Sequence, residues 1–433
     1  MITCTRLSIS HLWVDALCIL QDDADDADWT EQSAEMHMIY SNAYLVLAAD
    51  SALDCASGFL FQAMRENSMG YKVEDLRNNS WNVRRVPVRE GNKSSFLLKH
   101  TLLSHRAWTL QETLLPPRIA HFTGTEIVLR IDEHFYCQCG RCTHFAYVGT
   151  EKQDWYAIVS LYSFRDLSHP EDKLPALSGL ASRVARPGDV YLAGLWQKTL
   201  ERDLLWYVSG VSGVHRRSMP WIAPTWSWAS MDGGIEYFSG YANYIFEKDL
   251  RIWKAECELA STSAFGQVSS GLIDLTGSVV PVNLVVLTER FPNYDDEYNG
   301  QHGKASRVHE TTCLIHGEET SVFEVLCDQS MMPTPGVNED ERALWLSGKP
   351  GDPQVSHGPY FCLYVGRYME RIFDMDDFRG GKRSFREWFL LLKRYDDGND
   401  VFERVGVGYK SSRNFESACD LFNAAERRRI RLI

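Results

Sequence analysis

The chain has 433 residues, of which 44% are hydrophobic and 24% charged, a composition typical of folded globular proteins. This length predicts two or three domains, with enough apolar side chains to form cores without disulfides or metals. The formal net charge of −13 argues against nucleic-acid binding and against docking on an anionic membrane, since both favour an excess of Lys and Arg.

The cysteines and the lengths of the apolar runs indicate the compartment. Most of the eleven cysteines stand singly in apolar segments, as Cys18 and Cys362 do, which is typical of free thiols in a reducing compartment. The apolar run from His11 to Leu20 is interrupted by Asp15 and followed by acidic residues, so it is a poor signal peptide. No uninterrupted apolar run approaches the roughly 18 residues of a membrane span. We therefore expect a soluble, cytoplasmic protein without a membrane span.

The first third of the chain predicts strands that alternate with helices. Residues 11–20 are almost continuously apolar, as in a strand buried on both faces of a parallel sheet. Residues 28–43 have apolar side chains at alternating four- and three-residue steps, and Asp28 and Glu31 have the spacing of a capping box, so we expect a helix. Residues 44–49 are the next apolar strand. Strand, helix and strand in this order predict a right-handed βαβ unit.

A second helix is expected over residues 105–115, with Ser104 as its cap and Pro116 after its end. Residues 118–137 predict two strands around a turn at Gly124. Helix-spaced apolar positions then recur over residues 155–164, 176–184 and 191–207.

From about residue 220 the pattern is typical of β-structure. Short alternating segments recur between turn residues, at 225–228, 272–287, 313–315, 322–327, 360–365, 388–394 and 402–407. A last helix is expected over residues 415–429. The chain has neither a phosphate-binding loop motif nor a nucleophile-elbow motif, which weakens nucleotide-hydrolase and serine-hydrolase interpretations.

Three segments together resemble the heterokaryon-incompatibility (HET) family of filamentous fungi. Residues 12–23 (LWVDALCILQDD) resemble its central motif, residues 28–43 follow at the expected interval, and residues 104–112 (SHRAWTLQE) resemble its last motif. More loosely similar to large fungal members are the segments at 173–180, 191–196 and 223–230. The family's domain normally begins with a further strand and helix, whereas this chain reaches its central motif at once. We therefore expect a domain that lacks its N-terminal part.

The resemblance implies an α/β fold. Residues 1–145 are expected to form a partial HET domain, with a parallel sheet similar to that of Toll/interleukin-1 receptor (TIR) domains and flavodoxin. A helical segment over 146–215 and a β-rich C-terminal domain over 216–433 follow. The implied function is a signalling or effector role in non-self recognition and programmed cell death, with other signalling proteins or further copies of the chain as partners. A non-enzymatic interaction module is the alternative.

The resemblance also implies a site. Some TIR domains cleave NAD with a glutamate in a Trp-x-x-x-Glu pattern, which Trp108 and Glu112 match. The two share a helix face, so the indole would stack on a base while the carboxylate stabilises an oxocarbenium-like transition state. Glu112 is thus the expected catalytic residue of an NAD glycohydrolase-like activity. NAD is its substrate, no resident cofactor is implied, and Trp108, Arg106, Asp15 and Trp13 are the binding residues. The alternative is a core tryptophan beside a solvated or salt-bridged Glu112.

Three further patterns have a structural and a functional interpretation. Asp15 lies in an apolar segment and needs a partner if buried, so it either pairs with backbone N–H groups or Arg106, which we favour, or lines a cleft. Trp226 and Trp228 would share one strand face, as core residues, which we favour, or as a stacking platform. The basic end, residues 427–431, is interpreted as a solvated helix terminus rather than a targeting signal.

The most metal-like cluster comprises His134, Cys137, Cys139, Cys142 and His144. Zinc requires four thiolate or imidazole ligands, and no second Cys-x-x-Cys completes such a set. Free thiols are therefore the simpler interpretation, with a zinc-binding structural protein as the alternative. The aspartates between residues 22 and 28 are explained by an acidic helix N-terminus rather than by a cation site. The sequence thus predicts no metal ligands.

Overall fold

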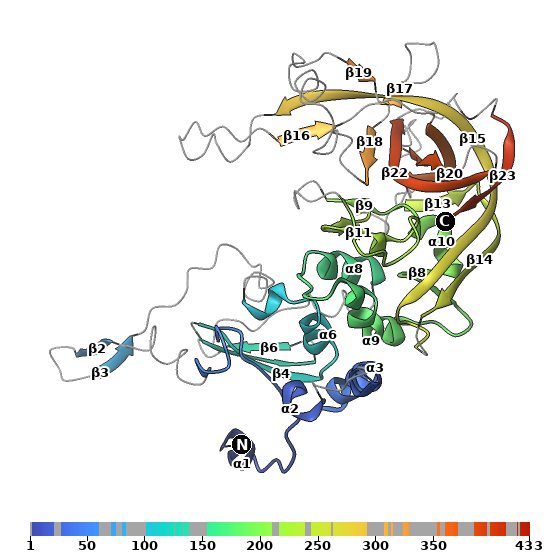
Figure 1. Cartoon of the computed structure of the whole chain (residues 1–433). Helices are drawn as coiled ribbons and strands as arrows, with labels where there is room; N and C mark the ends of the chain where they lie inside the picture. The colour runs from blue at the N-terminus through green and yellow to red at the C-terminus, as the bar shows by residue number, and fades with distance from the viewer. Residues whose placement is uncertain are drawn as a thin grey trace, which may run out of the picture. The chain divides into compact units, whose positions relative to one another are not determined.

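The computed structural model of the chain is shown in Figure 1. It describes residues 2–20, 27–59, 71–74, 80–83, 101–124, 126–132, 134–137, 154–209, 216–238, 244–260, 263–291, 307–310, 313–314, 324–328, 353–355, 360–370, 385–395, 399–412, 422 and 425–433. The chain divides into two compact units, residues 1–155 with 165–184 and residues 156–164 with 185–433. The first is a mixed α/β unit and the second consists mainly of β-strands.

A four-stranded sheet in the order β1-β4-β5-β6 forms the centre of the first unit. β1 (Val46–Ala48) pairs in parallel with β4 (Arg118–Phe122), and β5 (Ile127–Ile131) and β6 (His134–Cys137) continue the sheet in antiparallel fashion. A parallel pair requires a crossover connection, and the one between β1 and β4 contains helix α6 (Thr109–Leu114). This arrangement brings the carboxyl ends of β1 and β4 to the same edge of the sheet.

Three helices of the first unit pack on one another: α3 (Ala27–Asn42), α6 and α9 (Pro175–Val184). At Gly179 the two longer helices approach so closely that an added Cβ would lie 2.4 Å from the Cβ of His37. A glycine inside a helix costs about 1 kcal/mol relative to alanine, and this close approach accounts for it. The remaining elements of the unit are α1 (Ile2–Arg6), α2 (Asp15–Cys18), β2 (Tyr71–Glu74), β3 (Ser80–Val83), η1 (Leu103–His105) and η2 (Pro170–Lys173).

The predicted strand over residues 11–20 is wrong. These residues form the one-turn helix α2 and its flanks, and the side chains of Leu12, Leu17 and Leu20 are 49%, 81% and 68% exposed. A strand is stabilised by hydrogen bonds to a neighbouring strand, and among the described residues β1 pairs with β4 alone. The expected βαβ unit over residues 11–49 is therefore not formed, although its helix and second strand are present.

The helix predicted over residues 105–115 is shorter than expected. It begins at Thr109 and ends before Pro116, and Ser104 is not its cap. The Ser104 hydroxyl instead donates to the carbonyl of Thr101 at 2.6 Å, in the turn that precedes the helix. The two strands expected over residues 118–137 are three, because β6 follows β5 after a second tight turn at Asp132, whose φ is 50°.

The second unit is built on a large sheet with the strand order β13-β20-β21-β22-β23-β15-β14. Its strands are β13 (Tyr244–Lys248), β14 (Arg251–Leu259), β15 (Val268–Phe291), β20 (Tyr360–Glu370), β21 (Phe385–Arg394), β22 (Val401–Ser412) and β23 (Arg427–Leu432). The long strand β15, drawn as a strongly curved arrow in Figure 1, also pairs with β20, so the path from β20 to β15 closes on itself. Four short strands pair with β15 or β22: β16 (Arg307–Glu310), β17 (Cys313–Leu314), β18 (Glu324–Cys327) and β19 (Pro353–Val355).

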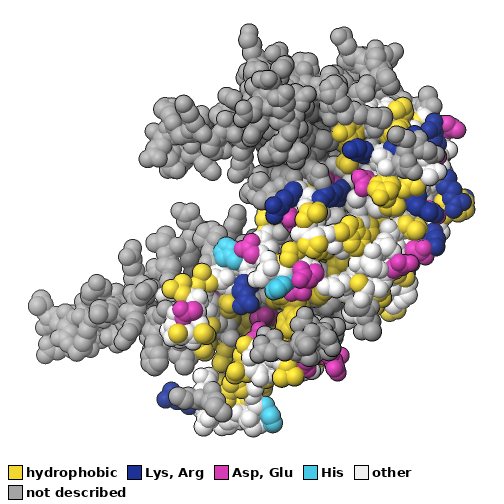
Figure 2. All heavy atoms as spheres, in the orientation of Figure 1, with side chains coloured by type: hydrophobic (Ala, Val, Ile, Leu, Met, Phe, Trp, Pro, Cys, Tyr) yellow, Lys and Arg dark blue, Asp and Glu magenta, His cyan; other side chains and the backbone are white. Residues whose placement is uncertain are grey.

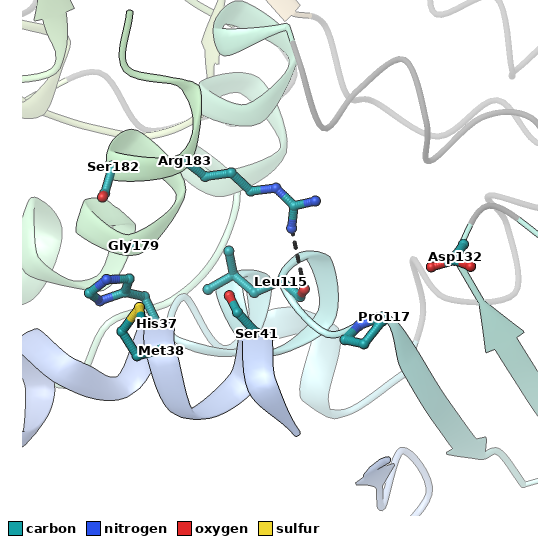
Figure 3. A pocket seen from close by; sticks show the side chains of 9 residues that line it. All are labelled: His37, Met38, Ser41, Leu115, Pro117, Asp132, Gly179, Ser182 and Arg183. Carbon is teal, nitrogen blue, oxygen red and sulfur yellow. Dashed lines mark hydrogen bonds between the residues drawn. The ribbon is translucent and has the colours of Figure 1, made fainter. Parts of the chain in front are cut away.

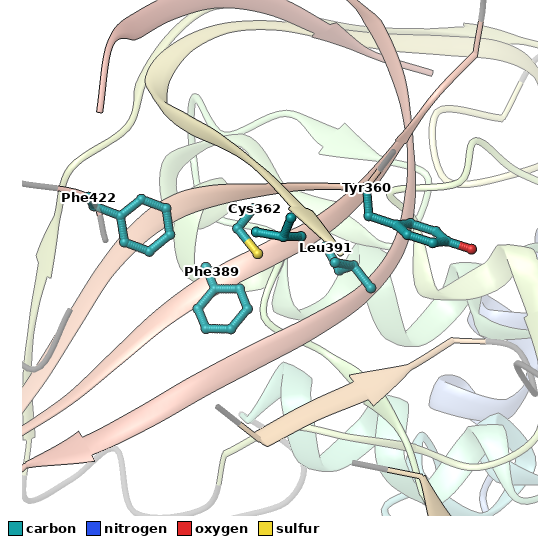
Figure 4. Close-up of a cluster of buried hydrophobic side chains, with 6 residues drawn as sticks. Tyr360, Cys362, Phe389, Leu391 and Phe422 are labelled. Carbon is teal, nitrogen blue, oxygen red and sulfur yellow. The ribbon is translucent and has the colours of Figure 1, made fainter. Parts of the chain in front are cut away.

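Alternating apolar side chains of this sheet form a buried cluster. Figure 4 shows its labelled members, Tyr360, Cys362, Phe389, Leu391 and Phe422, which lie together with Val282. The remaining elements of the unit are α8 (Trp155–Ser163), β7 (Tyr191–Leu192), β8 (Leu195–Trp196), η3 (Gln197–Thr199), α10 (Leu200–Asp203), β9 (Tyr207–Val208), β10 (Arg216–Arg217), η4 (Trp228–Ser230), β11 (Met231–Asp232) and β12 (Ile235–Glu236).

The structure confirms the helices predicted near residues 155–164 and 176–184 and the β-rich character after residue 220. The helix predicted over 191–207 forms in its later part alone, as η3 and α10. Its first part is wrong, because Ala193 and Gly194 have φ angles of 46° and 100° and turn the chain between β7 and β8. The strand predicted at 225–228 is also wrong, since this segment leads into η4. Trp226 and Trp228 are nevertheless buried, at 0% and 1% exposure, and belong to the core.

The predicted terminal helix is wrong where the structure describes it. Residues 427–432 form β23, which pairs along β15, and its side chains Ile430 and Leu432 alternate into the core. The basic end is therefore part of a strand. Arg431 in this strand donates two hydrogen bonds to Asp274 of β15, at 2.7 and 3.0 Å. Residues 415–421, 423 and 424 of the predicted helix lie outside the described residues.

Candidate functional site

A cavity of about 110 Å³ lies in the first unit where the parallel strands β1 and β4 end. Asp50 lies two residues after the end of β1, and His121 lies near the end of β4. The polar and charged residues in its wall are Tyr40, Asp50, Thr101, Ser104, Thr109, Glu112, Thr113, His121 and Arg165. In open α/β sheets, ligands bind outside the carboxyl ends of parallel strands. The position of the cavity and the chemistry of its wall make it the candidate site.

Glu112 enters the cavity wall from α6 as a partly buried side chain. Burial and the negative charge of Asp15 raise the pKa of Glu112 to about 7. The positive charges of Arg106 and Arg165 and a hydrogen bond from Tyr40 act in the opposite direction and lower it. The carboxyl group is thus close to half ionised at neutral pH. A group in this state exchanges protons efficiently, which is the property required of a general acid or base.

Arg165 is held beside the first turn of α6. Its Nη1 donates to the hydroxyl of Thr109 at 2.9 Å and to the carbonyl of Arg106 at 3.2 Å. The Thr109 hydroxyl lies 2.7 Å from the same carbonyl, so guanidinium, hydroxyl and backbone form one small network. The site therefore has a fixed cation in its wall, in addition to the charge of Arg106.

Asp50 and His121 form a pair that the sequence interpretation missed. The His121 Nδ1 atom lies 2.8 Å from Asp50 Oδ2, and the two side chains are 2% and 4% exposed. The signal in the sequence was a single polar residue near the end of each apolar strand. It was not recognised because the parallel pairing of residues 46–48 with 119–121 was not expected.

Three of the predicted binding residues, Trp13, Asp15 and Arg106, are not part of the cavity wall that contains Glu112. Asp15 and Arg106 act on it through their charges, and Asp15 begins α2, where its carboxylate accepts a hydrogen bond from the Ala16 N–H at 2.8 Å. The ring of Trp13 packs edge-on against Tyr40, with centroids 5.7 Å apart.

Trp108 is not among the residues that line the cavity. Its Nε1 donates to Asp172 at 3.1 Å, and its ring packs edge-on against Trp29 at 5.6 Å. The indole is therefore held by contacts within the first unit. The helix-face argument placed Trp108 and Glu112 together, but Trp108 precedes the first residue of α6.

A second, more open pocket of about 400 Å³ lies between α3, α9 and the end of α6 (Figure 3). Arg183 reaches across it and donates to the carbonyl of Leu115 at 3.3 Å. The nearby Arg130 is fully buried and donates to the carbonyls of Thr113, Pro116 and Asp132. Burial and the charge of Arg183 lower the pKa of Arg130 to about 10. Because both guanidinium groups already hold backbone carbonyls, the Glu112 cavity is the stronger candidate.

In the part of the chain that the structure describes, no group of three or more His, Cys, Asp or Glu is arranged to hold a metal. His134 and Cys137 of the metal-like cluster lie on β6, whereas Cys139, Cys142 and His144 lie outside the described residues. None of the described helices combines the length and apolar character that a membrane span needs. On the face drawn in Figure 2, Lys and Arg side chains are interspersed with Asp and Glu.

Residues 1–112 match the family model of the heterokaryon incompatibility protein (HET). The N-terminal part of this chain is a HET segment. No curated protein and no solved structure matches the chain. The HET segment ends at Glu112 and includes Asp15, Tyr40 and Asp50, whereas His121 and Arg165 lie beyond it. The cavity thus combines residues of the HET segment with residues that follow it.

Proposed function

We propose that this protein is a HET-type signalling or effector protein of non-self recognition and programmed cell death, and that its HET domain, over residues 1–145, cleaves NAD with Glu112 as the catalytic carboxylate. The HET segment supports the biological role. One observation carries the chemistry: the Glu112 carboxyl lines a cavity at the ends of two parallel strands, with a pKa of about 7.

The reaction class follows from what a carboxylate in this position stabilises. Breaking the bond between ribose and nicotinamide develops positive charge on the ribose, and an ionised Glu112 would lie beside that charge. The pyridinium nitrogen takes the bonding electron pair and becomes neutral, so nicotinamide leaves without an acid. Tyr40 restricts the carboxylate through its hydrogen bond. Arg165 and Arg106 supply positive charge for the diphosphate of the substrate.

The cavity volume limits which part of the substrate enters. Sites that enclose a whole ligand have volumes of roughly 300–1,000 Å³. At about 110 Å³, this cavity accommodates the bond to be broken and its immediate surroundings, and the adenosine half of NAD remains outside. The cavity itself would then recognise the nicotinamide–ribose end, and the two arginines would hold the diphosphate.

A non-enzymatic interaction module is the second candidate, and a separate observation favours it. Leu12, Leu17 and Leu20 around α2 are 49%, 81% and 68% exposed, and they lie on a segment that matches the HET model. Exposed apolar side chains close together are typical of a docking surface for another protein or another copy of the chain. In this case the cavity would have no chemical role.

Nicotinamide release separates the two functions. The purified full chain is mixed with NAD, and wild type is compared with Glu112→Gln and with Glu31→Gln, a matched control on the exposed face of α3. We expect nicotinamide release by wild type and by the control, and a loss of about 10²–10⁴-fold in Glu112→Gln. Equal rates in all three proteins, or no release by wild type, would contradict NAD cleavage. Death on expression, scored for the same variants, tests the biological role.

A further inference from the structure

The Asp50–His121 pair is the feature of the cavity that the proposed function has not yet used. An ionised aspartate accepts hydrogen bonds only, so the His121 Nδ1 atom, 2.8 Å from its carboxylate, is the nitrogen that carries the proton. In the neutral ring, Nε2 is then the free acceptor. The second nitrogen of a histidine is fixed in this way by the bond that the first one makes.

The Nε2 atom of His121 is buried and has no hydrogen-bond partner among the described residues. A buried polar atom without a partner costs about 1–3 kcal/mol, so this arrangement is costly unless something in the cavity bonds to it. Both members of the pair belong to the cavity wall. At about 110 Å³, the cavity has room for several water molecules, each with a share of about 30 Å³ in the liquid.

We infer that Asp50 and His121 are a second catalytic pair in the Glu112 cavity, in which Nε2 accepts the proton of the attacking water. This inference rests on the proposed function and names the base of the same reaction. The water oxygen forms a bond to ribose C1′ while the bond from C1′ to the nicotinamide nitrogen breaks. The bonding pair goes to nicotinamide, and the water proton goes to Nε2 and then to solvent. No oxidant, reductant or second substrate is needed.

The division of roles follows from the positions of the side chains. Glu112 comes from α6, where Tyr40 and Arg165 face it, and it stabilises the charge that develops on the ribose. His121 comes from β4 and contacts Asp50, which follows β1. Asp50 is a positioning residue: it keeps the imidazole in the tautomer that presents Nε2 to the cavity.

Kinetics of matched variants test the pair. We expect His121→Gln to lower kcat about 10²–10⁴-fold with KM within about threefold of wild type, as for loss of a general base. Asp50→Asn should lower kcat less and also leave KM unchanged. Added imidazole should restore activity to His121→Ala, in which the space of the ring is vacated. The control is His169→Gln, from a pair with Glu171 at 3.3 Å whose side chains are 71% and 50% exposed.

A wild-type rate in His121→Gln, or rates that fall only through KM, would overturn the inference. A measurement on the wild-type protein tests the inference even if the variants fail to fold. In ¹⁵N NMR spectra of the histidine side chains, we expect protonated Nδ1 and unprotonated Nε2 for His121, and a shift of Nε2 when nicotinamide is added. A ring with protonated Nε2, or no shift, would also overturn it. If wild type releases no nicotinamide, the proposed function fails, whereas the tautomer and the shift still decide whether Nε2 faces a ligand.

Discussion

The phenol of Tyr40 donates a hydrogen bond to the carboxylate of Glu112 and so links helix α3 to helix α6 at the cavity. Each group affects the other's protonation. The bond lowers the pKa of Glu112, whereas burial and the nearby Glu112 charge raise the pKa of Tyr40 well above its ordinary value. The phenol therefore stays protonated as a donor over the pH range in which the carboxyl group titrates.

Removing this donor should shift the titration of Glu112 upward. In Tyr40→Phe the ionised carboxylate loses its bond, so its pKa rises above about 7, and Asp15→Asn should lower the pKa because a repelling charge is lost. The measurement is the ¹³C shift of the Glu112 carboxyl carbon against pH, with Glu31→Gln as the unaffected control. Shifts in the same direction for both variants would contradict this account of the site.

Glu112 should also make the protein less stable as pH rises. Its pKa is 4.5 ordinarily and about 7 when folded, so between these values the folded state binds more protons than the unfolded state. Stability contributed by the protonated group is complete below about pH 4.5 and is lost as pH rises through 7. At about 1.4 kcal/mol per pKa unit, the loss approaches about 3 kcal/mol.

Urea denaturation at pH 5 and pH 8 measures this effect. Glu112→Gln cannot ionise, so its free energy of unfolding should change less between the two pH values than that of wild type. The difference between the two proteins isolates Glu112 from all other titrating groups. Parallel pH dependences would show that the carboxyl group is not desolvated in the folded state.

The sequence predicted the long strands of the second unit better than the segments whose structure depends on distant contacts, for a physical reason. Along residues 272–287 the alternation of apolar side chains is a local property, and the strand forms there as expected. Residues 11–20 are equally apolar, yet a strand exists only if a neighbouring strand pairs with it, which no local pattern records. The leucines over residues 191–207 are likewise spaced as in a helix, but the turn at Ala193 and Gly194 prevents a helix in the first part of this segment.

The same distinction applies to the candidate site. Glu112 could be named from a short motif, because the residues of the motif are neighbours in the chain. Asp50 and His121 are 71 residues apart, and the parallel register of β1 and β4 alone brings them together. Trp108 shows the converse: its spacing to Glu112 was correct, but the contact with Asp172 comes from a distant segment.

In the second unit, breaking a fully buried ion pair should lower the free energy of unfolding strongly. Arg404 and Asp328 are both 0% exposed, with Arg404 Nε 3.2 Å from Asp328 Oδ2, and Arg404 also donates to the carbonyl of Leu204 at 2.7 Å. Burial lowers the pKa of Arg404 to about 10, against the opposing charge of Asp328. Arg404→Met leaves the buried charge of Asp328 with the more distant Arg217, at 3.7 Å, as its ion-pair partner, and we expect a loss of about 3–5 kcal/mol.

The double variant Arg404→Met with Asp328→Leu should lose less than the sum of the two single variants, because neither charge of this pair is left buried alone. Arg217, which lies 3.7 Å from Asp328 in the wild type, keeps its hydrogen bond to the carbonyl of Thr225. The exposed pair of Lys254 and Glu256 provides the control, and Lys254→Met should change stability by less than about 1 kcal/mol. Urea denaturation followed by tryptophan fluorescence measures the free energy of unfolding of these variants. Additive losses in the double variant would indicate that the two charges do not interact.

A substitution at Gly194 tests which contacts fix the turn between β7 and β8. Its φ is 100°, and an added Cβ would lie 2.5 Å from Nε1 of Trp228, the buried indole that donates to the Gly194 carbonyl at 3.0 Å. Gly194→Ala therefore meets both backbone strain and a steric clash, and we expect a loss of about 2–4 kcal/mol in the free energy of unfolding.

Gly188→Ala is the matched control: its φ is 68°, but the nearest atom to the added Cβ is Nζ of Lys198, at 3.8 Å. There we expect backbone strain alone, about 1 kcal/mol. Equal losses in the two variants would show that Trp228 moves aside, so that the turn does not depend on this indole.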